Sequence, residues 1–264
     1  MNTIRDQIIG AWIPSTGPTG YSLLDRSGNG THLTWTSPSA TNWQANGRGG
    51  WCASTTGGGD FIATTRRIPA TVAGFSVVHW LNARSYSGTA NSMDANRGVY
   101  ASGNVGPRLE FGAVAYWVYS SNTTTGGVLT VHDCGSSLVS LNDWGCYVLT
   151  HDGLTTSTTY QQGRPSGLTQ SNVSGHSGAF VGSFGAMRLG QGSSDSGRGI
   201  DGLFGGTLIY SRPIAPAEVR WIFDQGPSMS WVMEPRRRLA TYKAPAFRAH
   251  YATQRAQLIG GGLR

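Results

Sequence analysis

The sequence predicts an all-β fold, a two-sheet antiparallel sandwich with one short C-terminal capping helix and an extended C-terminal arm. Apolar packets of strand length recur along the chain, and turn residues separate them. Glycine is abundant, with 39 among 264 residues, while charged residues make up only 12% of the chain. Many short strands joined by tight glycine-rich turns are typical of a sandwich, and the length suits a single one plus an extension.

The predicted strands are rich in β-branched and aromatic residues, as sandwich-core strands are. Turn signals such as Ser27-Gly-Asn-Gly30 and Asp152-Gly153 separate them. The predicted strands are Ile8–Ile13, Thr31–Thr36, Phe61–Thr65, Phe75–Ala83, Gly98–Ala101, Arg108–Ser120, Gly127–His132, Cys146–His151, Thr158–Gln162, Ala179–Phe184, Ala186–Gly190 and Gly205–Tyr210.

One segment, Pro213–Asp224, has a helical pattern. Proline stands near its start, Glu218 lies in an early turn, and Gly226-Pro227 follows as a stop signal. Its apolar residues recur at helical spacing: Ile214, Val219, Ile222 and Phe223. We therefore predict a short helix that caps the sandwich.

The positive charge of the chain is concentrated at its C-terminus. Residues 234–264 hold seven basic groups and one acid, whereas residues 1–233 hold 13 basic groups and 12 acids. Such asymmetry is typical of an interaction tail. The sequence therefore predicts a sandwich domain over residues 1–233 and a basic, extended anchoring arm over residues 234–264, interrupted by Pro235 and Pro245.

The three cysteines, Cys52, Cys134 and Cys146, have neither zinc-type spacing nor the pattern of a disulfide framework. The N-terminus lacks a signal-peptide pattern, and no apolar run is long enough for a membrane helix. We therefore expect a protein that is made in the cytoplasm, is not secreted and does not insert into a membrane.

Several of these segments resemble the laminin-G-like jelly roll of the concanavalin A superfamily. Gly10-Ala-Trp12 is similar to the opening strand of that family, Asp25–Gly30 to its early turn, Phe75–Trp80 to its central strand, and Gly202–Glu218 to its closing strand and capping helix. The resemblance implies that the sandwich is a jelly roll. The family often has an acid after the glycine of the closing strand, but this chain has Gly205-Gly206-Thr207.

The tail resembles C-terminal segments of bacteriophage structural proteins, through Pro235–Arg238 and the run from Phe247 to Leu263. This resemblance implies a virion component, either a head decoration protein or a tail-associated module. The expected partners are other virion proteins, major capsid or tail subunits, and copies of the same chain. The expected location is the virion of a phage made in the host cytoplasm.

The sequence predicts no enzyme and no catalytic residues. A glycoside hydrolase needs a pair of carboxylates around the scissile bond. The chain has only three glutamates, Glu110, Glu218 and Glu234, and none has an acidic partner at strand spacing. The G-x-S-x-G elbow of a serine hydrolase is also absent.

Candidates for a metal site are confined to single acids in turns. Asp60, after Gly57-Gly-Gly, and Asp152, after His151, could each contribute to a calcium site. Calcium needs several oxygens that converge on one point, and an isolated Asp in a turn more often caps the backbone. We therefore expect no cofactor, with calcium as the alternative.

The alternative function is that of a carbohydrate-binding adhesin, which would recognise a glycan on the host surface. Exposed aromatic rings can stack on sugar rings. Trp117 and Tyr119 share one face of a predicted strand, while His151 and Asp152 end another strand beside a turn. These four residues are the predicted glycan-binding candidates.

The arm combines arginines with large apolar residues. Because a phosphate-binding arm has no need of such apolar groups, we expect it to dock on a protein rather than on nucleic acid. The residues predicted to anchor it are Trp231, Arg236, Arg237, Arg238, Tyr242, Phe247, Tyr251, Leu258 and Ile259.

Overall fold

The computed structural model describes most of the first 233 residues. The described ranges are 4–39, 42–45, 50–57, 60–68, 74–86, 90–95, 107–111, 115–123, 126–133, 141–154, 156–161, 164–169, 184–191 and 198–233. Residues 1–232 form one unit of the chain, and the fold below is the fold of that unit. The arm predicted over residues 234–264 lies outside the described residues and stays a prediction.

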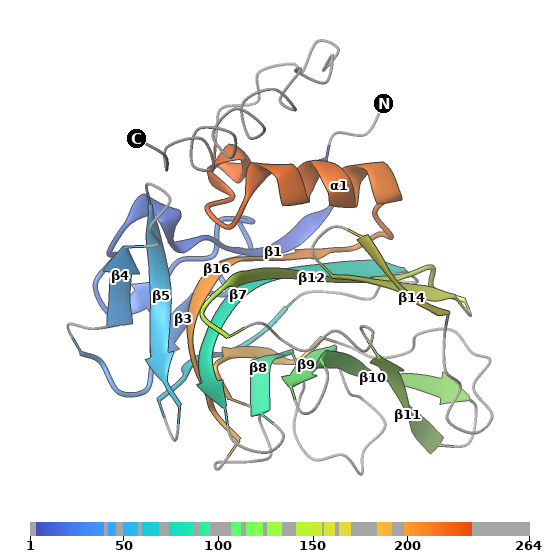
Figure 1. Ribbon diagram of the computed structural model, residues 1–264, viewed down its shortest axis with the longest axis horizontal. Coiled ribbons are helices and arrows are strands. Elements are labelled where there is room, and N and C mark those ends of the chain that lie inside the picture. Colours follow the sequence, from blue (N-terminus) through green and yellow to red (C-terminus); the bar gives the residue numbers. More distant parts are fainter. Residues whose placement is uncertain are drawn as a thin grey trace, which may run out of the picture. The chain divides into compact units, whose positions relative to one another are not determined.

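Two antiparallel sheets make up the unit (Figure 1). In sheet A the strand order is β14-β13-β12-β7-β16-β5-β4, and β1 also pairs with β16. The strands of sheet A are β1 (Ile8–Trp12), β4 (Trp43–Ala45), β5 (Trp51–Thr56), β7 (Phe75–Tyr86), β12 (Trp144–His151), β13 (Ser157–Gln161), β14 (Arg164–Thr169) and β16 (Ile200–Tyr210).

In sheet B the order is β11-β10-β9-β8-β15-β6-β3-β2. Its strands are β2 (Ser22–Leu23), β3 (Leu33–Trp35), β6 (Ile62–Arg67), β8 (Ala90–Asp94), β9 (Arg108–Phe111), β10 (Ala115–Thr123), β11 (Gly126–Asp133) and β15 (Ala186–Leu189). Strands far apart in sequence are neighbours in both sheets, so the predicted all-β jelly-roll sandwich is confirmed.

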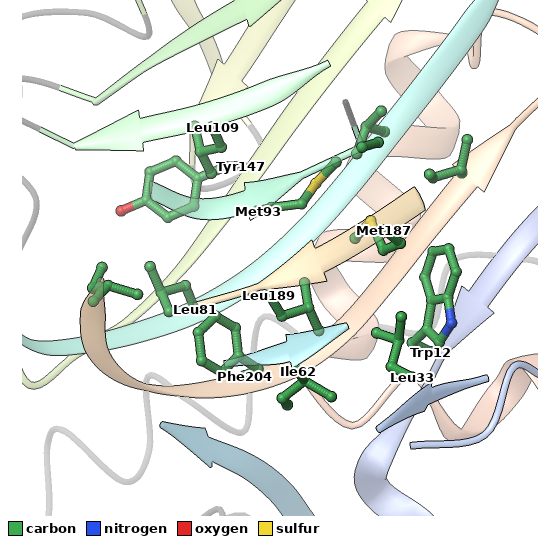
Figure 2. Packing of buried hydrophobic residues seen from close by; sticks show 14 of the residues in the cluster. Trp12, Leu33, Ile62, Leu81, Met93, Leu109, Tyr147, Met187, Leu189 and Phe204 are labelled. Atoms are coloured by element: carbon green, nitrogen blue, oxygen red, sulfur yellow. The ribbon is translucent and has the colours of Figure 1, made fainter. Parts of the chain in front are cut away.

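The hydrophobic core lies between the facing surfaces of the two sheets. Because side chains alternate across a strand, one residue in two points into this layer. Figure 2 shows side chains from both sheets meeting there, among them Trp12, Leu81 and Phe204 from sheet A and Ile62 and Leu189 from sheet B. All of these residues are at most 1% exposed, and burying one such side chain contributes about 1.5–3 kcal/mol.

The helix α1 (Pro216–Gln225) covers the outer surface of sheet A, where it lies across β1 and β16 (Figure 1). The ring of Phe223 stacks on Trp80 of β7 at a centroid distance of 5.7 Å. Glu218 accepts a hydrogen bond from the backbone N–H of Ala215 at the helix start and pairs with Arg212 at 2.6 Å. The predicted capping helix is confirmed, with its first turn at Pro216 rather than Pro213.

One predicted strand is wrong in its extent. Residues 108–120 were expected to form one strand, but the structure forms β9 and β10, which pair with each other as an antiparallel hairpin. The apolar pattern of the sequence continues from β9 into β10 without a break, so it gives no sign of two strands. Short strands with small or polar residues, β2, β4, β5, β8 and β14, were also missed. The predicted strand Gly98–Ala101 lies outside the described residues, as do residues 179–183 of the predicted strand Ala179–Phe184.

Candidate functional site

The outer surface of sheet B carries a line of residues that are register partners on six neighbouring strands. We call this line the outer row: Ser22, Thr34, Ala63, Arg188, Asp94 and Arg108, on β2, β3, β6, β15, β8 and β9. Their sequence neighbours Leu33, Ile62 and Leu189 belong to the core, so the members of the row point away from it. The row is a polar stripe across the sheet.

A pocket of about 450 Å³ opens at one end of the outer row. Thr34 and Ala63 of the row line it, together with Gly30, His32, Thr64, Thr65 and Arg66 from the flanking residues of β3 and β6. Its polar side chains are three threonine hydroxyls, an imidazole and a guanidinium. No carboxylate is among the lining residues.

The turn before β3 is built around the buried carboxylate of Asp25. This carboxylate accepts hydrogen bonds from the backbone N–H groups of Ala11 (3.1 Å), Ser27 (2.8 Å) and Thr31 (3.0 Å), and from the Thr31 hydroxyl (2.6 Å). Burial alone would raise the pKa of Asp25, but the hydrogen bonds from Thr31 and Ser27 outweigh it and hold the pKa below its usual value. These hydrogen bonds therefore fix the turn that precedes the pocket residue His32.

His32 is oriented by the same turn. Its Nδ1 accepts a 2.9 Å hydrogen bond from the backbone N–H of Asp25. A ring nitrogen that accepts a hydrogen bond carries no proton, so the proton of the neutral imidazole is on Nε2. His32 can therefore offer a ligand in the pocket one N–H donor.

Arg66 lines the pocket, and the carbonyl of Gly30 accepts a 3.2 Å hydrogen bond from its Nη1. Gly30 has a φ of +69°, and a β carbon there would lie 3.2 Å from the same Nη1. Glycine therefore serves both the left-handed turn and the close approach of Arg66.

The other end of the outer row is a buried ionic cluster. Arg108 forms an ion pair with Glu110 of the same strand, and the side chains are 1% and 5% exposed. Asp94 of β8 is fully buried and lies opposite Arg108 of β9 and opposite Arg188 of β15. Asp94 and Glu110 therefore lie on adjacent strands, and Arg108 lies beside both. Because the two acids are far apart in the sequence, the sequence alone did not reveal that they are neighbours.

Two exposed aromatic residues lie near the β2 and β5 ends of the sandwich. Tyr21 is 64% exposed and directly precedes Ser22, the register partner of Thr34 in the pocket. Trp51 is 40% exposed and packs against Gly17. Neither residue was a predicted candidate, because exposed rings cannot be told from core rings by residue type alone.

Trp117, a predicted glycan-binding residue, is a core residue. It is fully buried and belongs to the cluster between the sheets, so its ring cannot stack on a sugar. The parity of β10 was assigned the wrong way round, because the strand carries aromatic residues on both faces. Tyr119 lies on β10, but its side chain is outside the described part of the structure.

His151 and Asp152 are placed by a turn rather than by a ligand site. His151 is 2% exposed, stacks on Phe75 at 5.5 Å and accepts a 2.8 Å hydrogen bond at Nδ1 from the N–H of Gly153. Burial lowers the pKa of His151, although the Asp152 carboxylate opposes this. Asp152 accepts from the N–H groups of Leu154 and Thr156 at 2.7 and 3.0 Å. The Asp-Gly turn is confirmed.

The two metal candidates lie in separate turns. Asp60 accepts a 3.3 Å hydrogen bond from the N–H of Thr56 in the connection from β5 to β6, while Asp152 closes the β12–β13 turn. Within the described ranges, no three His, Cys, Asp or Glu side chains gather as metal ligands would. Likewise, no helix in the described part of the chain has the length and apolarity to cross a membrane.

Trp231 belongs to the sandwich unit rather than to the arm. It lies in a short 3-10 helix, Ser230–Val232, is 5% exposed and packs edge-to-face on Trp221 of α1 at 4.7 Å. Arg5 donates a hydrogen bond to its carbonyl. The other predicted anchor residues of the arm, Arg236 to Ile259, lie outside the described residues.

The architecture is that of a lectin-like sandwich. Residues 56–220 match the family Laminin_G_3, described as the concanavalin A-like lectin/glucanases superfamily. The match covers more than half of the chain, so the protein belongs to this family. No curated protein sequence matches the chain.

Solved structures with the same fold share little sequence with this chain. Domain 4 of an extracellular arabinanase from Geobacillus stearothermophilus, in complex with arabinotriose, has a TM-score of 0.55 and 17% identity over 82% of this chain and 98% of that one. The binding domain of botulinum neurotoxin DC, in complex with SialylT, has a TM-score of 0.59 and 12% identity over 84% of this chain and 52% of that one.

A third similar structure is the Trypanosoma rangeli sialidase in complex with sialic acid. It has a TM-score of 0.57 and 15% identity over 86% of this chain and 33% of that one. Our chain thus spans about half of the toxin binding domain and a third of the sialidase. At these identities the likeness shows the fold, and the residues of the pocket must carry any functional conclusion.

Proposed function

We propose that this protein binds carbohydrate in the pocket at the end of the outer row. The observation that carries the proposal is a pocket of about 450 Å³ with three hydroxyls, an imidazole and a guanidinium on the outer surface of sheet B. Sites for small ligands commonly measure about 300–1,000 Å³ and hold a few convergent polar groups. The pocket is large enough for one or two sugar units by that measure.

The fold comparisons support this proposal over a purely structural role. The arabinanase domain and the toxin binding domain were both solved with saccharides, and each covers most of this chain. The alternative of a glycan-binding protein, raised from the sequence, is therefore the reading that we favour. The virion role rests on the resemblance of the tail, outside the described residues, and stays a prediction along with the virion location.

We propose binding without turnover. Of the acids near the outer row, Glu110 is engaged with Arg108 and Asp94 is fully buried between two arginines of the row. Hydrolysis needs a carboxylic acid and a carboxylate that flank the scissile bond. Neither of these two acids lines the pocket, so neither is placed to protonate a leaving group there.

The test is binding of the labelled full chain to an array of glycans. We expect a defined subset to bind, and we expect Thr65→Trp to abolish binding because the indole fills the pocket from an exposed position. Leu154→Trp, at a residue 67% exposed in the β12–β13 turn, is the matched control and should bind as the wild type does. Absence of binding to every glycan, or binding unaffected by Thr65→Trp, would refute the proposal.

A further inference from the structure

We infer that the pocket is selective for saccharides that carry an oxyanion, either a carboxylate or a sulfate ester. This inference rests on the proposed function and specifies its ligand class. It follows from the balance of hydrogen-bond donors and acceptors in the pocket, from the way Arg66 is held, and from the charges that surround it.

The pocket contains two groups that can only donate. These are Arg66 and the Nε2–H of His32, because Nδ1 of His32 already accepts from the N–H of Asp25. The remaining polar side chains are the hydroxyls of Thr34, Thr64 and Thr65, which can donate or accept, and the Thr64 oxygen accepts a 3.1 Å bond from the N–H of Arg66. A sugar hydroxyl both donates and accepts, whereas an oxyanion only accepts, so the groups that can only donate favour an oxyanion.

The guanidinium of Arg66 is positioned to bind an oxyanion. One arm of its guanidinium is fixed by the carbonyl of Gly30, so less side-chain freedom is lost on binding. The planar fork of a guanidinium matches a carboxylate or sulfate with two parallel hydrogen bonds. Arg66 is exposed, so these donors face solvent in the absence of a ligand.

The surrounding charges favour an anion. Arg67 follows Arg66 on β6, and Arg188 is the register partner of Ala63 on the pocket floor. Asp94 is the next residue of the outer row beyond Arg188, where it is fully buried and also opposite Arg108. Asp60 precedes β6, and its carboxylate accepts a hydrogen bond from the backbone N–H of Thr56 at the end of β5. The lining of the pocket therefore carries a guanidinium and no carboxylate, while the carboxylate of Asp25 is buried in the turn behind His32, where its own hydrogen bonds engage it.

The experiment uses a glycan array in which each neutral core is printed beside its sialylated, uronic-acid-bearing and sulfated derivatives. We expect the full chain to bind anionic members about tenfold or more tightly than their neutral cores, the size expected for a charge-assisted hydrogen-bond pair. Preference for the carboxylated or for the sulfated derivatives identifies which oxyanion the site takes. Rising salt should reduce the preference.

Two variants distinguish an effect of Arg66 itself from an effect of the net positive charge of the protein. Arg66→Gln should remove the preference for anionic members and leave its melting temperature unchanged, because the side chain is exposed. Arg26→Gln removes another exposed arginine, one that bonds Thr16 outside the pocket, and should keep the preference. Equal binding of neutral and anionic members overturns the inference and leaves the proposed function standing. Loss of preference in both variants also overturns it, whereas no binding to any glycan overturns the proposed function itself.

Discussion

The backbone N–H of Asp25 donates a 2.9 Å hydrogen bond to Nδ1 of His32, which joins a buried turn to an exposed pocket. The carboxylate of Asp25 accepts four hydrogen bonds from Ala11, Ser27 and Thr31. The D-x-S-G-N-G turn thus orders the loop that carries Gly30 and His32 to the pocket. Its role in the site is to position these groups.

Asp25→Asn is expected to weaken both folding and binding. An amide nitrogen in place of Oδ2 would face the N–H and hydroxyl of Thr31, two donors, at 3.0 and 2.6 Å. Leaving buried polar groups unpaired costs about 1–3 kcal/mol each. Chemical denaturation should show the loss, and glycan affinity should fall in parallel. Thr31→Val removes only the hydroxyl and should have the smaller effect; equal stability of Asp25→Asn and the wild type would contradict this account.

Trp117 should matter for stability and not for binding. Truncating a buried Trp to Ala costs about 3–5 kcal/mol, and Trp117 is fully buried in the core. We expect Trp117→Ala to show this loss by denaturant unfolding. Trp117→Phe keeps a ring in the core and should remain folded, with glycan affinity unchanged. A folded Trp117→Phe that no longer binds glycan would restore Trp117 as a site residue.

His79 is expected to make the fold sensitive to mild acid. It is fully buried beside Phe204 and within 2.9 Å of the Thr207 hydroxyl, and burial lowers its pKa to about 3. The unfolded chain takes up this proton near pH 6.5, whereas the folded protein takes it up only near the lowered pKa. Stability should therefore fall as pH drops from about 6.5 towards 3, by about 1.4 kcal/mol for each pH unit.

The variant His79→Asn lacks a titrating group and tests this dependence. Denaturant unfolding at pH 7.0, 6.0 and 5.5 should show the wild type losing stability relative to the variant, before most carboxylates titrate. His151, whose pKa is also lowered, is present in both proteins and cancels in the difference. Parallel stability profiles would show that His79 is not the group responsible.

A chain that ends at Met233 is expected to unfold cooperatively and to bind glycan as the full chain does. The last described contacts of the sandwich unit are those of Trp231 with Trp221 and Arg5. A chain that ends at Pro227 also loses the buried side chains of Met229 and Trp231, and should be clearly less stable. Circular dichroism melting of the two truncated chains provides the measurement. Failure of the longer one to fold would show that residues beyond 233 belong to the fold.

Much of the fold could be predicted from local patterns. Phe75–Trp80 alternates between core and helix-facing side chains, and Pro216, Glu218 and Gly226 start and stop α1 as their chemistry requires. The short strands β2 and β4 escaped prediction, because two or three residues are too few to show an alternation. The hairpin of β9 and β10 was read as one strand because its apolar pattern is unbroken.

The sequence by itself determined the fold class, the family resemblance and the capping helix, because these follow from periodicity and turn chemistry over neighbouring residues. Only the tertiary structure brought together the residues of the outer row and of the pocket that we propose as the site. The outer row joins Ser22, Thr34, Ala63, Asp94, Arg108 and Arg188 through strand register, which pairs residues up to 125 positions apart. Whether a ring such as Trp117 or Tyr21 is buried depends on which sheet covers it. The sequence of a single strand does not show which strands lie beside it in the fold.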